Sequence, residues 1–144
     1  MQHQATLRWL KFACLFVIGF GLMGVLATVP ALSGATRFFV DLAFWPVDGA
    51  PGTPTPESNL LWAIVNGILV GWGVLLWQVT TKVYVNRPDV GRNMILTSVG
   101  IWFVIDSAGS IAAGAPVNAL LNITFLLMFF IPLWRPVREA EARR

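Results

Sequence analysis

Four long apolar runs, at residues 12–29, 59–81, 93–113 and 117–134, dominate the sequence. A helix needs about 20 apolar residues to cross the hydrocarbon core of a bilayer. Because the chain has 144 residues, four such helices leave room only for connections. The sequence therefore predicts an all-α integral membrane protein with one transmembrane domain, residues 1–144. This domain is a four-helix bundle with helices at about 7–29, 59–81, 88–113 and 117–134.

The composition supports the membrane class. Charged residues make up 12% of the chain and hydrophobic residues 56%, whereas a soluble domain carries about 25% charged residues. A net charge of +3 is a reason to consider nucleic acid in a soluble protein. Here the basic residues stand in short clusters beside apolar runs, which is how membrane topology is encoded. We therefore expect the lipid bilayer as a partner, and no nucleic acid.

The basic residues also predict the orientation. Nine of them fall on one side of a four-helix topology, and only Arg37 falls on the other. The positive-inside rule then places both the N- and the C-terminus in the cytoplasm. The nine residues are Arg8, Lys11, Lys82, Arg87, Arg92, Arg135, Arg138, Arg143 and Arg144.

The connection between the first two runs, residues 30–58, forms the long outer loop. Arg37 and Asp41 stand one helical turn apart in it, so their charges can pair. Aromatic and aliphatic neighbours are available for lipid, which predicts a short interfacial helix on the outer leaflet. The segment is marked by Arg37, Asp41 and Trp45, and its lipid-facing residues are expected to be Phe38, Phe39, Leu42 and Trp45.

The second part of this loop contains four prolines between positions 46 and 56, which predicts a stiff, non-helical strap. The outer loop, residues 30–58, is either a connector or a docking or substrate-facing lid. At its end, Thr55 and Pro56 suit the N-cap and the first position of the next helix.

Asp106 interrupts an apolar run, "WFVIDSAGSI" at 102–111. An aspartate near the middle of a membrane costs about 2.5–3.5 kcal/mol on insertion scales, so it should face the bundle interior and find partners. At 1.5 Å per residue, Asn66 and Asn122 reach the depth of Asp106, roughly 10 Å below the outer surface. The predicted polar intramembrane cluster consists of Asp106, Asn66, Asn118, Asn122, Ser107 and Ser110.

Two interpretations of this cluster stay open. In one, Asp106 accepts hydrogen bonds from Asn66 and Asn122 and locks the helices together. In the other, Asp106 handles a proton or a substrate at a site that opens to the outer face. No lysine or arginine lies at its depth, and intramembrane ionisable residues commonly mark functional sites.

Other chemistry finds little support. His3 is the only histidine and Cys14 the only cysteine, so we expect no haem, no metal site and no other cofactor. No nucleophile and base can be paired, so we expect no catalytic residues and no enzyme. Small residues allow close helix approach, either within the chain or against a partner. The candidates for helix packing are Gly67, Gly71, Gly19 and Gly24.

Four segments of the sequence, "FWPVDG", "GWGVLLW", "WFVIDSAGSIAAGAPVN" and "FFIPLW", resemble a group of small four-helix bacterial inner-membrane proteins of uncharacterised activity. The resemblance extends from about Leu7 to Trp134. It implies a multi-pass protein of the bacterial inner (cytoplasmic) membrane, and it assigns no site residues.

Two functional hypotheses follow. The first is a structural or accessory subunit of a larger membrane complex, such as an energy-transducing one, with other membrane subunits or copies of itself as partners. Its basis is the minimal loops, the glycines and the absence of cofactor ligands. The second is a small oligomeric transporter or channel component in which Asp106 couples to a proton or a substrate.

Overall fold

The computed structural model describes residues 2–49 and 52–135. These residues form five α-helices and two irregular helical turns. The helices are α1 (Gln2–Leu26), α2 (Gly34–Ala43), α3 (Pro56–Gln78), α4 (Pro88–Ala112) and α5 (Pro116–Leu133), and the turns are a 3-10 turn, η1 (Pro30–Leu32), and a π-helical turn, η2 (Val79–Tyr84). The predicted all-α fold is confirmed. Arg138, Arg143 and Arg144, which contributed to the predicted orientation, lie outside the described residues.

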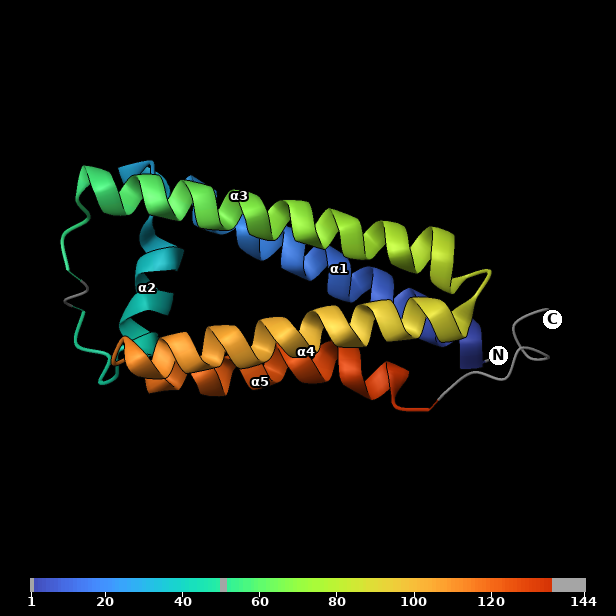
Figure 1. Ribbon diagram of the computed structural model, residues 1–144. Helices are drawn as coiled ribbons and strands as arrows, with labels where there is room; N and C mark the ends of the chain where they lie inside the picture. Colours follow the sequence, from blue (N-terminus) through green and yellow to red (C-terminus); the bar gives the residue numbers. More distant parts are fainter. Residues whose placement is uncertain (1, 50–51, 136–144) are drawn as a thin grey trace.

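Four helical segments are long and apolar enough to cross a membrane, judged by length and composition. They contain α1, α3 continued through η2, α4 and α5. They form two antiparallel pairs, α1 with α3 and α4 with α5. In Figure 1 the pairs lie close together where the N-terminus and the α3–α4 connection lie, and further apart at the opposite end. We call these the closed end and the α2 end, because α2 lies across the space between the pairs there.

The closed end holds the packed core of the bundle. Its buried side chains come from α1, the end of α3, η2, α4 and α5. In this half α1 approaches α3 closely, because Gly73 carries no side chain where Ile18 and Val17 pack against it. The fully buried members include Leu10, Cys14, Val17, Thr80, Tyr84, Ile95, Val99, Phe129 and Leu133.

Two helices extend beyond the predicted ends. α1 begins at Gln2 instead of residue 7, and α3 continues through η2 to Tyr84 instead of ending at 81. Both extensions meet: the ring of His3 stacks on Tyr84 with centroids 5.3 Å apart. The two added helical segments meet in this contact. A hydropathy pattern cannot predict it, because the two residues are far apart in the sequence. The predicted start of α3 is confirmed, since Thr55 caps it in a capping box with Ser58 and Pro56 follows.

Pro132 lies inside the last turn of α5. Proline has no N–H, so the carbonyl of Met128, four residues earlier, lacks its usual helical donor. The indole N–H of Trp9 donates to that carbonyl at 2.8 Å, which ties α1 to α5. At the same end, the Arg92 Nε donates to the Leu133 carbonyl at 2.7 Å and ties α4 to α5.

A helix, α2, is present at the segment that contains Arg37 and Asp41, but two expectations about its side chains were wrong. Within the described residues Asp41 forms no ion pair with Arg37. Its buried carboxylate accepts instead the backbone N–H groups of Asp48, at 3.3 Å, and Gly49, at 2.9 Å. Asp41 therefore fixes the start of the proline-containing strap.

The second wrong expectation concerns Phe39, which turns inward rather than toward lipid and packs edge-on against Phe20 of α1. Phe38 and Trp45 are exposed as predicted, and Leu42 is half-buried.

Candidate functional site

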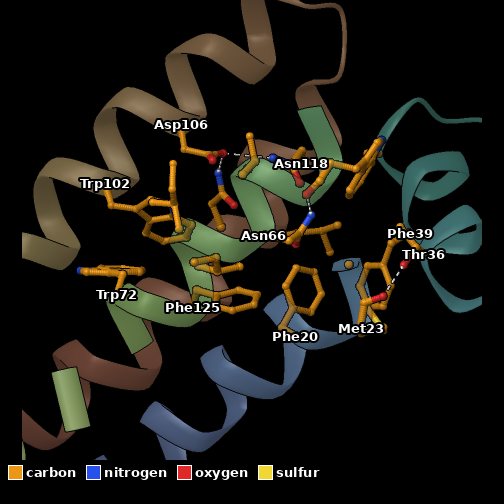
Figure 2. Close-up of a pocket in the computed structure, with 18 of the residues that line it drawn as sticks. Phe20, Met23, Thr36, Phe39, Asn66, Trp72, Trp102, Asp106, Asn118 and Phe125 are labelled. Atoms are coloured by element: carbon orange, nitrogen blue, oxygen red, sulfur yellow. Dashed lines mark hydrogen bonds between the residues drawn. The ribbon is translucent and has the colours of Figure 1, made fainter. Parts of the chain in front are cut away.

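A cavity of about 690 Å³ lies between the two helix pairs at the α2 end. Side chains from all five α-helices line it (Figure 2), and Thr36, Phe39, Val40 and Ala43 of α2 cover it. The hydroxyl of Thr36 donates to the carbonyl of Met23 at 3.3 Å, which fastens α2 to the end of α1. A volume of this size lies within the range of about 300–1,000 Å³ that small-molecule sites occupy.

The α4–α5 hairpin brings the polar side chains together on one wall of the cavity. Gly114 adopts a φ of +80° in the turn, a conformation that favours glycine, and Pro116 begins α5 directly afterwards. Side chains one turn apart on each helix then face one another across the hairpin. As a result, Asp106 and Ser110 on α4 meet Asn118 and Asn122 on α5.

Asp106 accepts three hydrogen bonds on one carboxylate oxygen. The amide nitrogens of Asn122 and Asn118 donate to Oδ1 at 2.6 and 3.2 Å, and the Ser110 hydroxyl donates at 3.3 Å. The two amides also donate to serines, Asn118 to Ser110 at 2.8 Å and Asn122 to Ser107 at 3.3 Å. We call Asp106, Ser107, Ser110, Asn118 and Asn122 the polar cluster.

The second oxygen of Asp106 is different. No donor in the described part of the chain reaches Oδ2, and Oδ2 is not among the buried unpaired atoms there. Of the described residues that line the cavity, Asp106 is also the only ionisable one. The cavity therefore contains one accessible carboxylate oxygen and no counter-charge from its lining residues.

Asn66 lines the same cavity from α3 but does not join the polar cluster. Its amide donates to the Trp62 carbonyl in its own helix at 2.9 Å, so the expected hydrogen bond from Asn66 to Asp106 is absent among the described contacts. Gly24 makes room for Asn66, because a methyl group at position 24 would overlap the carboxamide. Asn66 thus faces the cavity opposite the α4–α5 hairpin.

Five aromatic rings contact one another in a continuous chain beside the polar side chains. Trp72 packs on Trp102 with centroids 5.7 Å apart, and Trp102 packs on Phe125 at 5.9 Å. Phe125 then packs on Phe20 at 5.3 Å, and Phe20 on Phe39 at 5.2 Å. Each ring comes from a different α-helix. We call Phe20, Phe39, Trp72, Trp102 and Phe125 the aromatic floor, which Figure 2 shows to one side of Asp106 and Asn118.

Sequence reasoning missed the cavity and most of this floor. Trp72 and Trp102 lie deep in their apolar runs, away from the helix ends where membrane tryptophans usually gather, and the structure gives both a role in the floor. The indole of Trp72 also donates to the Ser98 hydroxyl at 2.7 Å. One pattern in the sequence could have indicated the floor. Trp102 lies about one helical turn before Asp106, and Phe125 lies about one turn after Asn122, so each ring is close to a polar residue of the cluster.

The candidate glycines separate into two groups. Gly24 packs against Asn66, as described above. Gly19, Gly67 and Gly71 have open space where a side chain would stand and are exposed. Within the described residues, no group of three or more metal-binding side chains is found.

Comparison of the chain with protein families, with curated proteins and with solved structures finds no match.

The polar cluster predicts opposite outcomes for two substitutions of Asp106. Asp106→Leu removes the acceptor shared by Asn118 and Asn122, and leaving buried donors unpaired costs about 1–3 kcal/mol. Asp106→Asn keeps an oxygen for the three donors, and its new amide points where no protein donor lies. We expect the melting temperature in detergent to fall for Leu and to change little for Asn. Equal melting temperatures for Asp106→Leu and the unmodified protein would contradict a stabilising role for the cluster.

Proposed function

We propose that the protein is a transporter or channel component that binds a small amphipathic solute in the cavity between its two helix pairs. The observation that carries this proposal is the combination of an aromatic floor with one accessible carboxylate oxygen inside a cavity of about 690 Å³. Apolar walls with a few convergent polar groups are typical of small-molecule sites.

A purely structural role for Asp106 explains only part of this arrangement. It accounts for the bonds from Asn118, Asn122 and Ser110 to Oδ1. It leaves the accessible Oδ2 and the open volume without a purpose, although protein interiors are normally filled to the density of organic crystals. A binding role accounts for both.

We further propose that the protein lies in the bacterial inner membrane with both termini in the cytoplasm and with the α2 end at the outer face. The distribution of basic residues supports this orientation. Among the described residues, the closed end carries Arg8, Lys11, Lys82, Arg87, Arg92 and Arg135, and the α2 end carries Arg37. In this setting α2 covers the cavity on the outer side, which favours a lid over a simple connector.

Filling the cavity should abolish solute binding. Leu121 lines the cavity, whereas its neighbour Leu120 does not and is 63% exposed. We expect 1-naphthalenemethanol, a neutral amphipathic probe, to bind nanodiscs that contain the protein above empty nanodiscs in equilibrium dialysis. Leu121→Trp should remove this excess by occupying the cavity, and Leu120→Trp should keep it. Equal binding by both variants, above the level of empty nanodiscs, would refute the proposed site.

A second proposal is that the protein is a structural or accessory subunit, assembled with another membrane subunit or with a second copy of itself. Its support is the outward-facing pair Gly67 and Gly71 on α3, which have open space around them in the chain itself. Such a spacing of small residues lets two helix backbones approach closely in a membrane.

The assembly proposal predicts that a bulky residue at this face disrupts the complex. Gly67→Leu should reduce the mass observed by native mass spectrometry in mild detergent to that of a single chain. Gly19→Leu serves as a matched control, because Gly19 is an exposed glycine of α1 that also has open space around it. A single-chain mass for the unmodified protein, with no co-purifying subunit, would exclude assembly through α3.

A further inference from the structure

We propose that the solute is a monovalent organic cation, an amine or ammonium group joined to an aromatic body, with its charge at Asp106 and its body on the aromatic floor. This inference rests on the proposed function, since it names the chemical class that the cavity binds. It follows from the charge, the ring surfaces and the spacing of the polar and aromatic layers.

The charge of the cavity is the first argument. Among the described residues that line it, Asp106 alone is ionisable, and a solute that displaces water from this carboxylate is bound best when it brings an opposite charge. The hydrogen bonds from Asn118, Asn122 and Ser110 all fall on Oδ1. Oδ2 is therefore the position at which a positively charged donor completes the coordination of the carboxylate.

The walls of the cavity select an organic cation over a metal ion. Calcium takes six to eight oxygen ligands and magnesium a near-ideal octahedron. Here one carboxylate stands among predominantly apolar lining residues. The faces of Trp72, Trp102 and Phe125 attract cations through their quadrupoles, whereas an anion would meet both those faces and the Asp106 carboxylate. An uncharged solute would leave Asp106 without a counter-charge.

The spacing of the layers limits the shape of the solute. Trp102 precedes Asp106 by one helical turn, so their Cα atoms are about 6 Å apart along α4. Trp102 also contacts Trp72 and Phe125, so the floor begins one helical turn along α4 from Asp106. An amine held to a ring system by one or two carbon atoms bridges this distance. Long alkylamines would need to fold.

Three probes that share the naphthalene ring system but differ in charge separate the effect of charge on binding from the effect of size. 1-Naphthalenemethylamine is protonated at neutral pH, 1-naphthalenemethanol is uncharged and 1-naphthoate is an anion. We measure each by equilibrium dialysis against the full-length protein in zwitterionic phosphatidylcholine nanodiscs and subtract the binding to empty nanodiscs. We expect the amine to bind about tenfold more tightly than the alcohol, a ratio that one desolvated cation–π contact or charge-assisted hydrogen bond can supply. The anionic probe, 1-naphthoate, should bind most weakly of the three.

Two variants then assign the preference to one side chain. Asp106→Asn should bring the amine and the alcohol to similar affinity, because it removes the charge and keeps the hydrogen-bond acceptor. Asp89→Asn is the matched control, since it removes another carboxylate of α4 from the first turn at the closed end, away from the cavity. It should leave the preference for the amine unchanged.

The possible outcomes distinguish this inference from the proposed function. Excess binding of the alcohol that Leu121→Trp abolishes, without tighter binding of the amine, would overturn the cation inference and leave the binding cavity standing. A preference for the amine that persists in Asp106→Asn would also overturn it. No excess binding of any probe would overturn the proposed function and this inference together.

Discussion

The α2 end of the bundle must supply hydrogen-bond partners for the carboxylate of Asp106. A charged or strongly polar group in apolar surroundings needs hydrogen-bond partners, and the penalty for leaving it unpaired is several kcal/mol. The α4–α5 hairpin supplies them through Asn118 and Asn122, with the shortest bond, 2.6 Å, from Asn122. Because the tight turn at Gly114 fixes the register of the hairpin, one wall of the cavity is set by local chain geometry.

The two halves of the bundle have different properties. At the closed end, glycine-assisted packing and the ties from Trp9 and Arg92 hold four helical segments around a buried core. At the α2 end the helix pairs separate, and α2 lies across the space between them (Figure 1). A well-packed half can compensate for a cavity in the other half. This division resembles the common arrangement in which a stable scaffold carries a less stable functional region.

Much of the fold could be predicted from the sequence. The apolar runs located four helices to within a few residues, except that α1 begins earlier and α3 continues through η2, up to the point where His3 stacks on Tyr84. The depth argument grouped Asp106 with Asn118 and Asn122, because depth along a helix depends only on residue count. It grouped Asn66 with them as well, but depth does not specify rotation, and the Asn66 amide bonds to its own helix.

The cavity itself could not be predicted in this way. Its volume depends on how far the two helix pairs separate, which results from packing between residues distant in the sequence. The inward face of α2 was misjudged for the same reason. Phe38 and Phe39 are equally apolar, and only the position of Phe20 on α1 determines which of them faces the bundle.

The central claim is that the space around Asp106 admits water and solutes while the outer surfaces of the same helices contact lipid. Cys14 is the only cysteine, so a Cys14→Ala background allows single cysteines to be compared. The rate of reaction with 2-(trimethylammonium)ethyl methanethiosulfonate reports contact with water, since only the thiolate reacts. We expect Leu121→Cys, inside the cavity, to react in nanodiscs and Leu120→Cys, one residue away, to remain unmodified. Unreactive cysteines at both positions, or faster reaction at position 120, would contradict the account.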